Sequence, residues 1–299
     1  MRSPTRKPDH IAVVWHDSIA SAENVGREIA TALREDSGDA ITTDCRPLHD
    51  REFRSRLEEK RYDLVITLGG DGTMLRTGKL CAPLKIPVCG VNLGSFGFMM
   101  ELPIDGWREM LPKLIRGEFM IEERMMIHVE VGRSDGAVIR SDVLNDAVFA
   151  RGLDVRPTRI AVRVNGNFLT EYVSDGLIAS TATGSTAYSM AVGGPIIAPE
   201  MKTILLIPIA PHLSLNHGLI LHPSDVIELS CRSRDITVLS LDGGRSIPIS
   251  EDDHVRITAS EDSAYFIRVG SEGSFYRNFI QYMQRNPSAV HHDPELTAN

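Results

Sequence analysis

The sequence predicts an α+β protein with two parts: a Rossmann-like N-terminal α/β domain on a parallel sheet, then a mostly antiparallel β domain. Up to residue 122, short apolar runs alternate with helix-length segments, as in a parallel sheet covered by helices. From residue 123 to 272, short alternating segments recur with turn residues between them, which is typical of a layered β domain. Residues 273–299 are expected to form a helix that returns to the first domain, followed by a flexible tail.

The elements of the first part follow from its apolar periodicity. Strands are expected at 11–15, 64–68 and 88–91, where apolar residues are nearly continuous. A helix is expected over 21–33, since its apolar residues recur at helical spacing. A second helix is expected over 107–114, and Pro112 inside it predicts a kink or a break.

The elements of the second part are short strands and tight turns. Strands are expected at 126–131, 143–150, 160–164, 226–231, 236–241 and 255–259. Asn165-Gly166 and Asp242-Gly243 have the composition of tight hairpin turns. Residues 274–283 carry Phe275, Phe279 and Met283 at helical spacing and predict the closing helix.

Composition excludes several classes of protein. The 299 residues are 42% hydrophobic and 24% charged, so a disordered chain is excluded. A net charge of −8 argues against a nucleic-acid partner, which needs basic surface. We find no apolar segment of membrane-spanning length and expect no membrane partner. Four cysteines without CxxC spacing suggest neither zinc nor disulfides, which favours a cytoplasmic location.

The most informative motif is Gly69-Gly70-Asp71-Gly72-Thr73, directly after the apolar run at 64–68. Its three glycines allow a ligand to approach the main chain, and Thr73 is expected to cap the following helix through its hydroxyl. The start of a helix favours an anion such as phosphate. A carboxylate would repel phosphate, so Asp71 is better suited to a metal or to an alcohol that attacks a phosphoryl group. A plain surface turn is an equally good interpretation of this motif alone.

Three further loops have the composition of ligand-binding segments. Residues 90–98 are rich in glycine and include Asn92, although a structural turn that holds Phe96 and Phe98 in the core explains them better. Asn145-Asp146 interrupts a strand-like run and suits either ribose hydroxyls or a β-bulge. Residues 175–189 run from a strand into hydroxyl side chains and then a short helix, which suits adenine, ribose or phosphate, with Tyr188 as a stacking face.

Taken in order, GGDGT, GVNLGSFGF, LND and DGLIASTATGSTAYSMAVGGP resemble the NAD kinase family, over residues 11–282. The resemblance implies an active site in a cleft between two domains, completed by a neighbouring subunit. It implies transfer of the γ-phosphoryl of ATP, or of polyphosphate in some members, to the 2′-hydroxyl of the adenosine ribose of NAD, which makes NADP. It also implies a divalent metal cofactor, Mg or Mn, and a homodimer or homotetramer.

The resemblance also implies a role for each matching position. Asp71 matches the catalytic proton acceptor, and Asn145 and Asp146 match an Asn-Glu pair that binds the ribose and adenine of NAD. Asp175 matches a contact to the nicotinamide end. The other expected substrate or nucleotide contacts are Gly70, Gly72, Thr73, Arg76, Asn92, Arg156, Thr186, Ala187, Tyr188, Ser189, Met190 and Ala191. No residue is predicted to bind the metal.

The chain departs from the family pattern at two positions. Asp146 is one methylene shorter than the usual Glu, and Gly244 stands where Gln is frequent, with Arg245 as a possible substitute. These departures keep open a noncatalytic module that senses NAD or NADP. The GGDGT turn keeps open a lipid or sphingoid-base kinase, which shares that motif.

Overall fold

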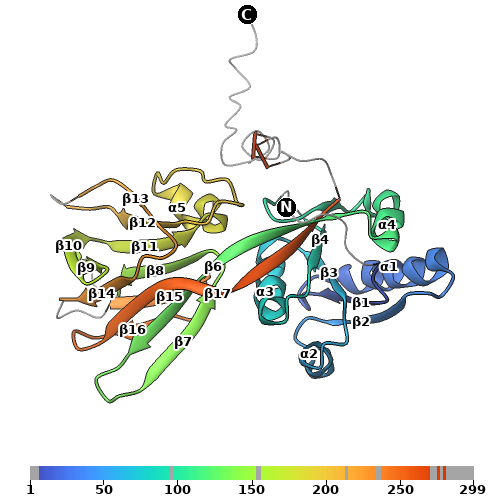
Figure 1. Cartoon of the computed structure of the whole chain (residues 1–299), viewed down its shortest axis with the longest axis horizontal. Helices are drawn as coiled ribbons and strands as arrows, with labels where there is room; N and C mark the ends of the chain where they lie inside the picture. Colours follow the sequence, from blue (N-terminus) through green and yellow to red (C-terminus); the bar gives the residue numbers. More distant parts are fainter. Residues whose placement is uncertain are drawn as a thin grey trace, which may run out of the picture. The chain divides into compact units, whose positions relative to one another are not determined.

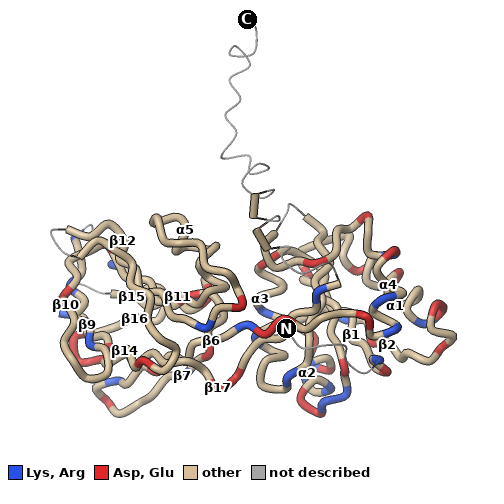
Figure 2. The backbone as a smooth tube through the Cα atoms, turned by 45° about the horizontal axis from the view of Figure 1, so that its top comes forward, with Lys and Arg blue, Asp and Glu red and all other residues tan. Residues whose placement is uncertain are grey.

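The computed structural model describes residues 7–94, 97–152, 156–212, 215–232 and 237–269, with residues 275, 276, 279 and 280. The chain divides into two compact units, one of residues 1–122 and 265–299, the other of residues 123–264. The boundaries lie within two long strands, β6 (Met120–Gly132) and β17 (His254–Arg268), labelled in Figure 1. Acidic and basic residues are interspersed along both units (Figure 2).

The first unit is built on a parallel sheet, as predicted. Its strands are β1 (His10–Trp15), β2 (Thr42–Pro47), β3 (Leu64–Gly69), β4 (Val88–Asn92) and β5 (Leu102–Pro103). Their order is β2-β1-β3-β4-β5, and every pair is parallel. The strand that follows β1 in the sequence, β2, lies on one side of it, whereas β4, which follows β3, lies on the opposite side. The direction of strand addition therefore reverses between β1 and β3. Ligands of open α/β sheets bind at the carboxyl ends of strands at such a point.

Helices cover both faces of this sheet. They are α1 (Ala22–Ser37), α2 (Arg51–Glu58), α3 (Asp71–Cys81), α4 (Trp107–Arg116) and the 3-10 turn η1 (Ala82–Leu84). On one face, Leu33 of α1 and Leu111 of α4 share a core with Ile66 of β3. On the other, the hydroxyls of Thr67 in β3 and Thr77 in α3 are 2.9 Å apart.

Of the kink or break predicted at Pro112, the break is wrong, because α4 continues through it to Arg116. Leu111 and Leu114, on either side of Pro112, are buried in the core of the first unit. Most helical stability in proteins comes from such packing, which offsets the hydrogen bond that proline cannot donate.

The second unit contains two antiparallel layers, as predicted. One layer includes β9 (Thr158–Val164), β10 (Asn167–Ser174), β14 (Ile227–Cys231), β17, β6 and β7 (Val138–Val143). The other has the order β13 (Leu219–Leu221), β12 (Ile204–Ile209), β11 (Gly176–Thr181), β8 (Asp146–Arg151), β15 (Thr237–Leu241) and β16 (Ile247–Ile249). Their facing side chains form one core that includes Val162, Leu229, Ala179 and Leu239.

The single strand predicted over 143–150 is wrong. Strand β7 ends at Val143 in the first layer, and β8 begins at Asp146 in the second layer. Leu144 and Asn145 form the connection between the two layers, so this is a change of sheet and not a β-bulge. The predicted turns are confirmed, since Asn165-Gly166 and Asp242-Gly243 both have positive φ.

The predicted closing helix at 274–283 falls largely outside the described residues, as does the tail. Residues 275, 276, 279 and 280 are helical. The ring of Phe279 stacks on that of Phe98 in the same unit, with centroids 6.0 Å apart. None of the helices in the described part of the chain has the length and apolar character needed to cross a membrane.

Candidate functional site

Asp71 is the first residue of α3 and follows β3 at the carboxyl end of the parallel sheet. The prediction that Thr73 caps this helix is wrong. Gly70 is the N-cap residue and makes no side-chain cap, while Thr73 is already the third helical residue and only 6% exposed. The helix begins so soon after the strand that the threonine hydroxyl lies within the first turn.

The carboxylate of Asp71 is held by a neighbouring loop. Its Oδ2 accepts the backbone N–H of Phe98 at 2.8 Å, and its Oδ1 accepts that of Met99 at 3.0 Å. A Cβ at Gly97 would lie 2.3 Å from Oδ1, so the approach of this loop requires glycine. Each carboxylate oxygen has a second lone pair, which leaves both able to accept a hydrogen bond from a substrate hydroxyl.

The other predicted residues of the first unit lie around the same strand ends. Asn92 ends β4 beside Gly69 in register, and its Oδ1 accepts the N–H of Gly94 at 3.1 Å. Gly72 and Arg76 are exposed and lie one turn apart on α3. The glycine-rich turn, Asn92 and Arg76 are therefore brought to one edge of the sheet.

A second group of predicted residues gathers in the second unit, where three strand ends meet. Antiparallel pairing places Asp146 of β8 opposite Ser180 of β11, and Ala147 opposite Leu241 of β15. The segments beyond these ends form a pocket of about 350 Å³. It is lined by Asn145, Asp146, Val148, Ala187, Tyr188, Ser240, Asp242 and Gly243.

The hydroxyl-rich segment at the end of β11 is fixed by hydrogen bonds within itself and to the backbone of Leu144 and Asn145. The Thr181 hydroxyl donates to the carbonyl of Leu144 at 2.5 Å, and the Ser185 hydroxyl donates to that of Ala182 at 2.8 Å. A Cβ at Gly184 would lie 2.1 Å from the carbonyl oxygen of Asn145. These hydroxyls shape the pocket rather than reach into it.

Asp146 is a buried acid at the wall of this pocket, with 5% of its surface exposed. Burial, and then the neighbouring Asp242 carboxylate, raise the pKa of Asp146 to about 6, while a hydrogen bond from the Tyr188 backbone lowers it. Asp146 therefore changes charge near neutral pH, in a place where a ligand could reach it.

Asp242 is a site residue that the sequence pattern did not reveal, since Asp242-Gly243 reads as a turn. Its Oδ1 accepts the N–H groups of Asn145 at 2.7 Å and Asp146 at 3.3 Å, and its Oδ2 accepts that of Leu144 at 3.1 Å. Gly243 lines the pocket, whereas Gly244 and Arg245 are exposed and are not among its lining residues.

Two buried polar atoms of this group have no hydrogen-bond partner among the described residues. They are Oδ1 of Asn145 and Oγ of Ser189, and Ser189 is fully buried in α5 (Tyr188–Ala191). An unsatisfied buried polar group costs about 1–3 kcal/mol, so such atoms are few and call for an explanation. Asn145 lines the pocket, so a ligand there would supply the partner that its Oδ1 lacks, whereas Ser189 is not among the lining residues.

The remaining predicted residues lie outside the lining of this pocket. The Asp175 carboxylate pairs with Nε of Arg151 at 3.1 Å. Asp175 is five residues before Ser180 along β11, which is roughly 16 Å at strand spacing. Arg156 and Ala191 are exposed, Met190 is half-buried, and the Thr186 hydroxyl donates to the Thr183 carbonyl.

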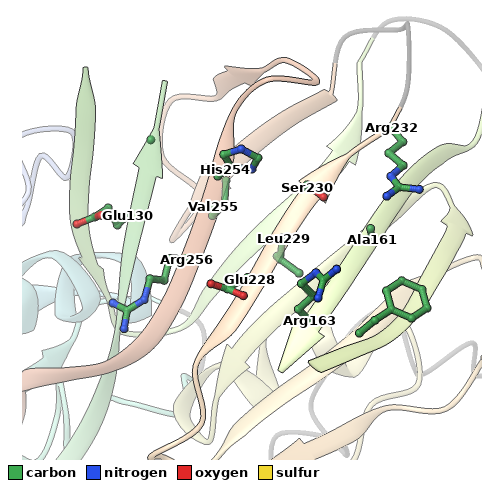
Figure 3. A pocket seen from close by; sticks show the side chains of 12 residues that line it. Glu130, Ala161, Arg163, Glu228, Leu229, Ser230, Arg232, His254, Val255 and Arg256 are labelled. Carbon is green, nitrogen blue, oxygen red and sulfur yellow. The ribbon is translucent and has the colours of Figure 1, made fainter. Parts of the chain in front are cut away.

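Another pocket, of about 430 Å³ and shown in Figure 3, contains none of the predicted residues. It lies on the exposed face of β9, β14 and β17, where Arg163 and Arg256 alternate with Glu228. Across the described ranges, no three His, Cys, Asp or Glu side chains are grouped so that they could hold a metal ion.

Family models match most of the chain. Residues 17–119 match the model described as the ATP-NAD kinase N-terminal domain, and residues 144–269 match the ATP-NAD kinase C-terminal domain.

Curated relatives of similar length agree with these matches. The chain is 39% identical to an NAD kinase of Dehalococcoides mccartyi over 229 residues, which are 76% of this chain and 81% of the relative. It is 35% identical to an NAD kinase of Heliobacterium modesticaldum over 281 residues, 92% of this chain and 98% of the relative.

Solved structures share the fold. Yeast NADH kinase, complexed with NADH, has a TM-score of 0.77 and 22% identity, over 96% of this chain and 89% of its own. An NAD kinase from Archaeoglobus fulgidus, in complex with ATP, has a TM-score of 0.72 and 23% identity, over 92% and 98%.

Proposed function

The chain belongs to the NAD kinase family and has the family's activity, with NAD and ATP as substrates, and on this basis we propose a role for each site residue. Asp71 accepts the proton of the 2′-hydroxyl on the adenosine ribose of NAD. The observation that carries this proposal is the pair of backbone N–H groups that hold both Asp71 oxygens. A base must be fixed within hydrogen-bond reach of the proton that it takes, and this carboxylate is fixed.

In the proposed step, the 2′-oxygen forms a bond to the γ-phosphorus of ATP while the bond to the leaving oxygen breaks. The electron pair of that bond stays on ADP, and the hydroxyl proton passes to Asp71. A carboxylate is a weak base toward an alcohol, so positioning and charge stabilisation supply most of the rate enhancement. The N-terminal end of the α3 dipole and the exposed Arg76 favour phosphate near this strand end.

The pocket in the second unit is proposed to bind the adenosine part of NAD. Asn145 and Asp146 contribute polar atoms to it, and Tyr188, which is 45% exposed, offers a ring for stacking. The unpartnered Oδ1 of Asn145 supports this assignment. Asp146 is shorter than the Glu of the family pattern, so its hydrogen bond to a ribose hydroxyl is expected to be longer or bridged by water.

We further propose that the reaction uses Mg or Mn and that the chain acts as a homodimer or homotetramer in the cytoplasm. Because no cluster of acidic or histidine ligands occurs in the described part of the chain, its donor set fits a cation carried on the phosphates of ATP. When bound, such a cation neutralises charge on the transferred phosphoryl group. Polyphosphate remains a second proposed donor.

An assay of NADP formation tests the proposal. Purified protein, NAD and Mg are mixed with ATP or with polyphosphate, and Asp71→Asn is measured alongside. We expect NADP from the unmodified protein and a loss of about 10²–10⁴-fold in kcat for Asp71→Asn, with NAD binding retained by calorimetry. Full turnover by the folded variant would refute the role of Asp71.

Asp63→Asn is a matched control for this assay. Asp63 is also an aspartate of the first unit whose carboxylate accepts two backbone N–H groups, from Asp9 and His10, but it precedes β3. Its substitution is expected to leave kcat unchanged. NAD binding without any product would favour the sensing module, and ATP consumption with a lipid alcohol would favour the lipid kinase; the comparisons favour neither.

A further inference from the structure

We propose that Arg268 is a positioning residue for Asp71 and acts through the backbone of Met99; the inference rests on the role proposed for Asp71. Nη1 of Arg268 donates to the Met99 carbonyl at 3.1 Å, and the Met99 N–H donates to Asp71 Oδ1 at 3.0 Å. Met99 is thus bound on one side by the base and on the other by a guanidinium. All three residues lie in the first unit.

Arg268 is itself held in place by two carboxylates. Its Nε and Nη2 donate to the two oxygens of Glu122 at 3.2 and 3.3 Å, and Nη1 also donates to Glu101 at 3.3 Å. The other Glu101 oxygen accepts the N–H of Val269 at 2.7 Å. Only 7% of Arg268 is exposed. A paired guanidinium with two parallel hydrogen bonds has a fixed direction, so the Met99 carbonyl meets a fixed donor.

Stability alone does not account for this buried cluster. A protein with apolar residues of similar volume in place of a buried ion pair is often equally stable, because the cost of desolvating the charges offsets their attraction. A guanidinium supplies what an apolar side chain cannot, a directed N–H for the Met99 carbonyl. An error of 1 Å in the position of a reacting group can cost about 10²-fold in rate. A charged cluster that fixes the position of Met99, and through it that of Asp71, would therefore contribute to catalysis.

The test is Arg268→Lys in the full chain. Lysine keeps the charge but cannot bond Glu122 through two nitrogens and Met99 through a third in this planar arrangement. We expect kcat to fall about 10- to 100-fold, with KM for NAD and for ATP within about 2-fold of the unmodified protein. Unchanged kcat in a folded variant would overturn the proposal.

Arg46→Lys is the matched control. Arg46 also bonds several carboxylates in the first unit, Asp44 at 2.7 Å and Glu52 at 2.7 Å, in the region of α2 where both charges are seen in Figure 2. Its ion-pair partners are Asp44, Asp50 and Glu52, none of which belongs to residues 97–99. An equal loss of kcat in this variant would assign the Arg268 effect to general stability and overturn the proposal.

A double variant separates positioning from structure. In the Asp71→Asn background, Arg268→Lys is expected to cause no further loss of kcat, because the base that it positions is gone. A further loss of the same size as in the unmodified background would contradict the proposal. Full activity of Asp71→Asn alone would instead refute the proposed function, so the two failures are distinguishable.

Glu122→Gln gives the same test if Arg268→Lys does not fold. The amide keeps one oxygen acceptor for Arg268 and removes one charge-assisted bond. We expect a smaller fall in kcat, about 3- to 10-fold, with KM unchanged. No change in kcat in this folded variant would also overturn the proposal.

Discussion

The Oδ1 atom of Asp242 accepts the backbone N–H of Asn145 at 2.7 Å. This bond connects Asp242, which follows β15, to Asn145, which precedes β8. The Asp242 N–H in turn donates to the Asp146 carbonyl at 2.9 Å. The pocket wall therefore depends on a carboxylate 97 residues away in the chain.

Asp242→Asn is expected to weaken NAD binding without a large effect on chemistry. The amide keeps one acceptor oxygen and loses the charge, so at least one of the three N–H groups loses its partner. Hydrogen bonds to charged groups contribute about 1.5–3 kcal/mol, so KM for NAD should rise roughly 10- to 100-fold. Steady-state kinetics would show kcat within about 3-fold of the unmodified protein.

Asp253→Asn is the control for that experiment. Asp253 is a buried aspartate of the same unit that accepts the Ser250 N–H at 2.8 Å and pairs with Arg133. It is not among the residues that line the pocket. An equal rise in KM for both variants would contradict the role of Asp242.

Asp146→Asn is expected to change how stability depends on pH. The pKa of Asp146 is raised from 3.8 to about 6, so the folded state binds more protons than the unfolded state between these values. The contribution of Asp146 to the free energy of unfolding therefore falls as pH rises from about 4 to about 6. A shift of about two units corresponds to roughly 3 kcal/mol.

The asparagine variant lacks this loss, so its free energy of unfolding should exceed that of the unmodified protein by up to about 3 kcal/mol at pH 7.5. The difference should shrink toward zero below about pH 4. Urea unfolding of both proteins across this range measures it. Parallel stability curves for the two proteins would show that Asp146 does not titrate in this window.

Gly97→Ala is expected to displace the proposed base. Its Cβ would lie 2.3 Å from Asp71 Oδ1, so either the carboxylate or the loop must move. We expect kcat to fall about 10²-fold in a protein that still folds, because the bonds from Phe98 and Met99 are disturbed. Gly94→Ala is the control from the same loop, where an added Cβ meets nothing within 4 Å. Similar activity in the two variants would exclude the steric explanation.

Ser189→Ala separates ligand binding from stability. The Ser189 hydroxyl is buried without a partner among the described residues, so its removal should leave the stability of the free protein within about 1 kcal/mol. If a substrate supplies the partner, NAD or ATP affinity should fall about 2- to 10-fold. Calorimetry measures the affinities of both substrates.

Ser185→Ala should show the opposite signature. The Ser185 hydroxyl donates to the Ala182 carbonyl and accepts the Ile197 N–H at 3.0 Å, so its loss should lower stability first. Unaltered affinity for both substrates in Ser189→Ala would leave its hydroxyl without a ligand role.

Local patterns predicted those elements whose burial is visible in the sequence. Strands β3 and β4 are fully or almost fully buried and have continuous apolar runs. Strand β2 was missed because it is the edge strand of the parallel sheet, and its polar residues are only partly buried. The change of sheet after Val143 was missed because a polar pair within a strand-like run has the same pattern whether it marks a bulge in one strand or the passage to another layer.

The site was predictable where it consists of a contiguous motif. Asp71 and the pair Asn145-Asp146 follow from their loops and from the family resemblance. Asp242 and Arg268 act through partners 97 and 169 residues away, and no local pattern in a single sequence encodes such a pairing. These long-range contacts needed the folded chain.

The stacking of Phe98 on Phe279 joins a residue near the carboxyl end of the sequence to the loop that holds Asp71. The N–H of Phe98 holds one oxygen of Asp71, so a single residue joins the proposed base to an aromatic ring near the end of the chain. A substitution at Phe279 is therefore expected to reach the Asp71 carboxylate through Phe98, although Phe279 lies more than two hundred residues after Asp71 in the sequence.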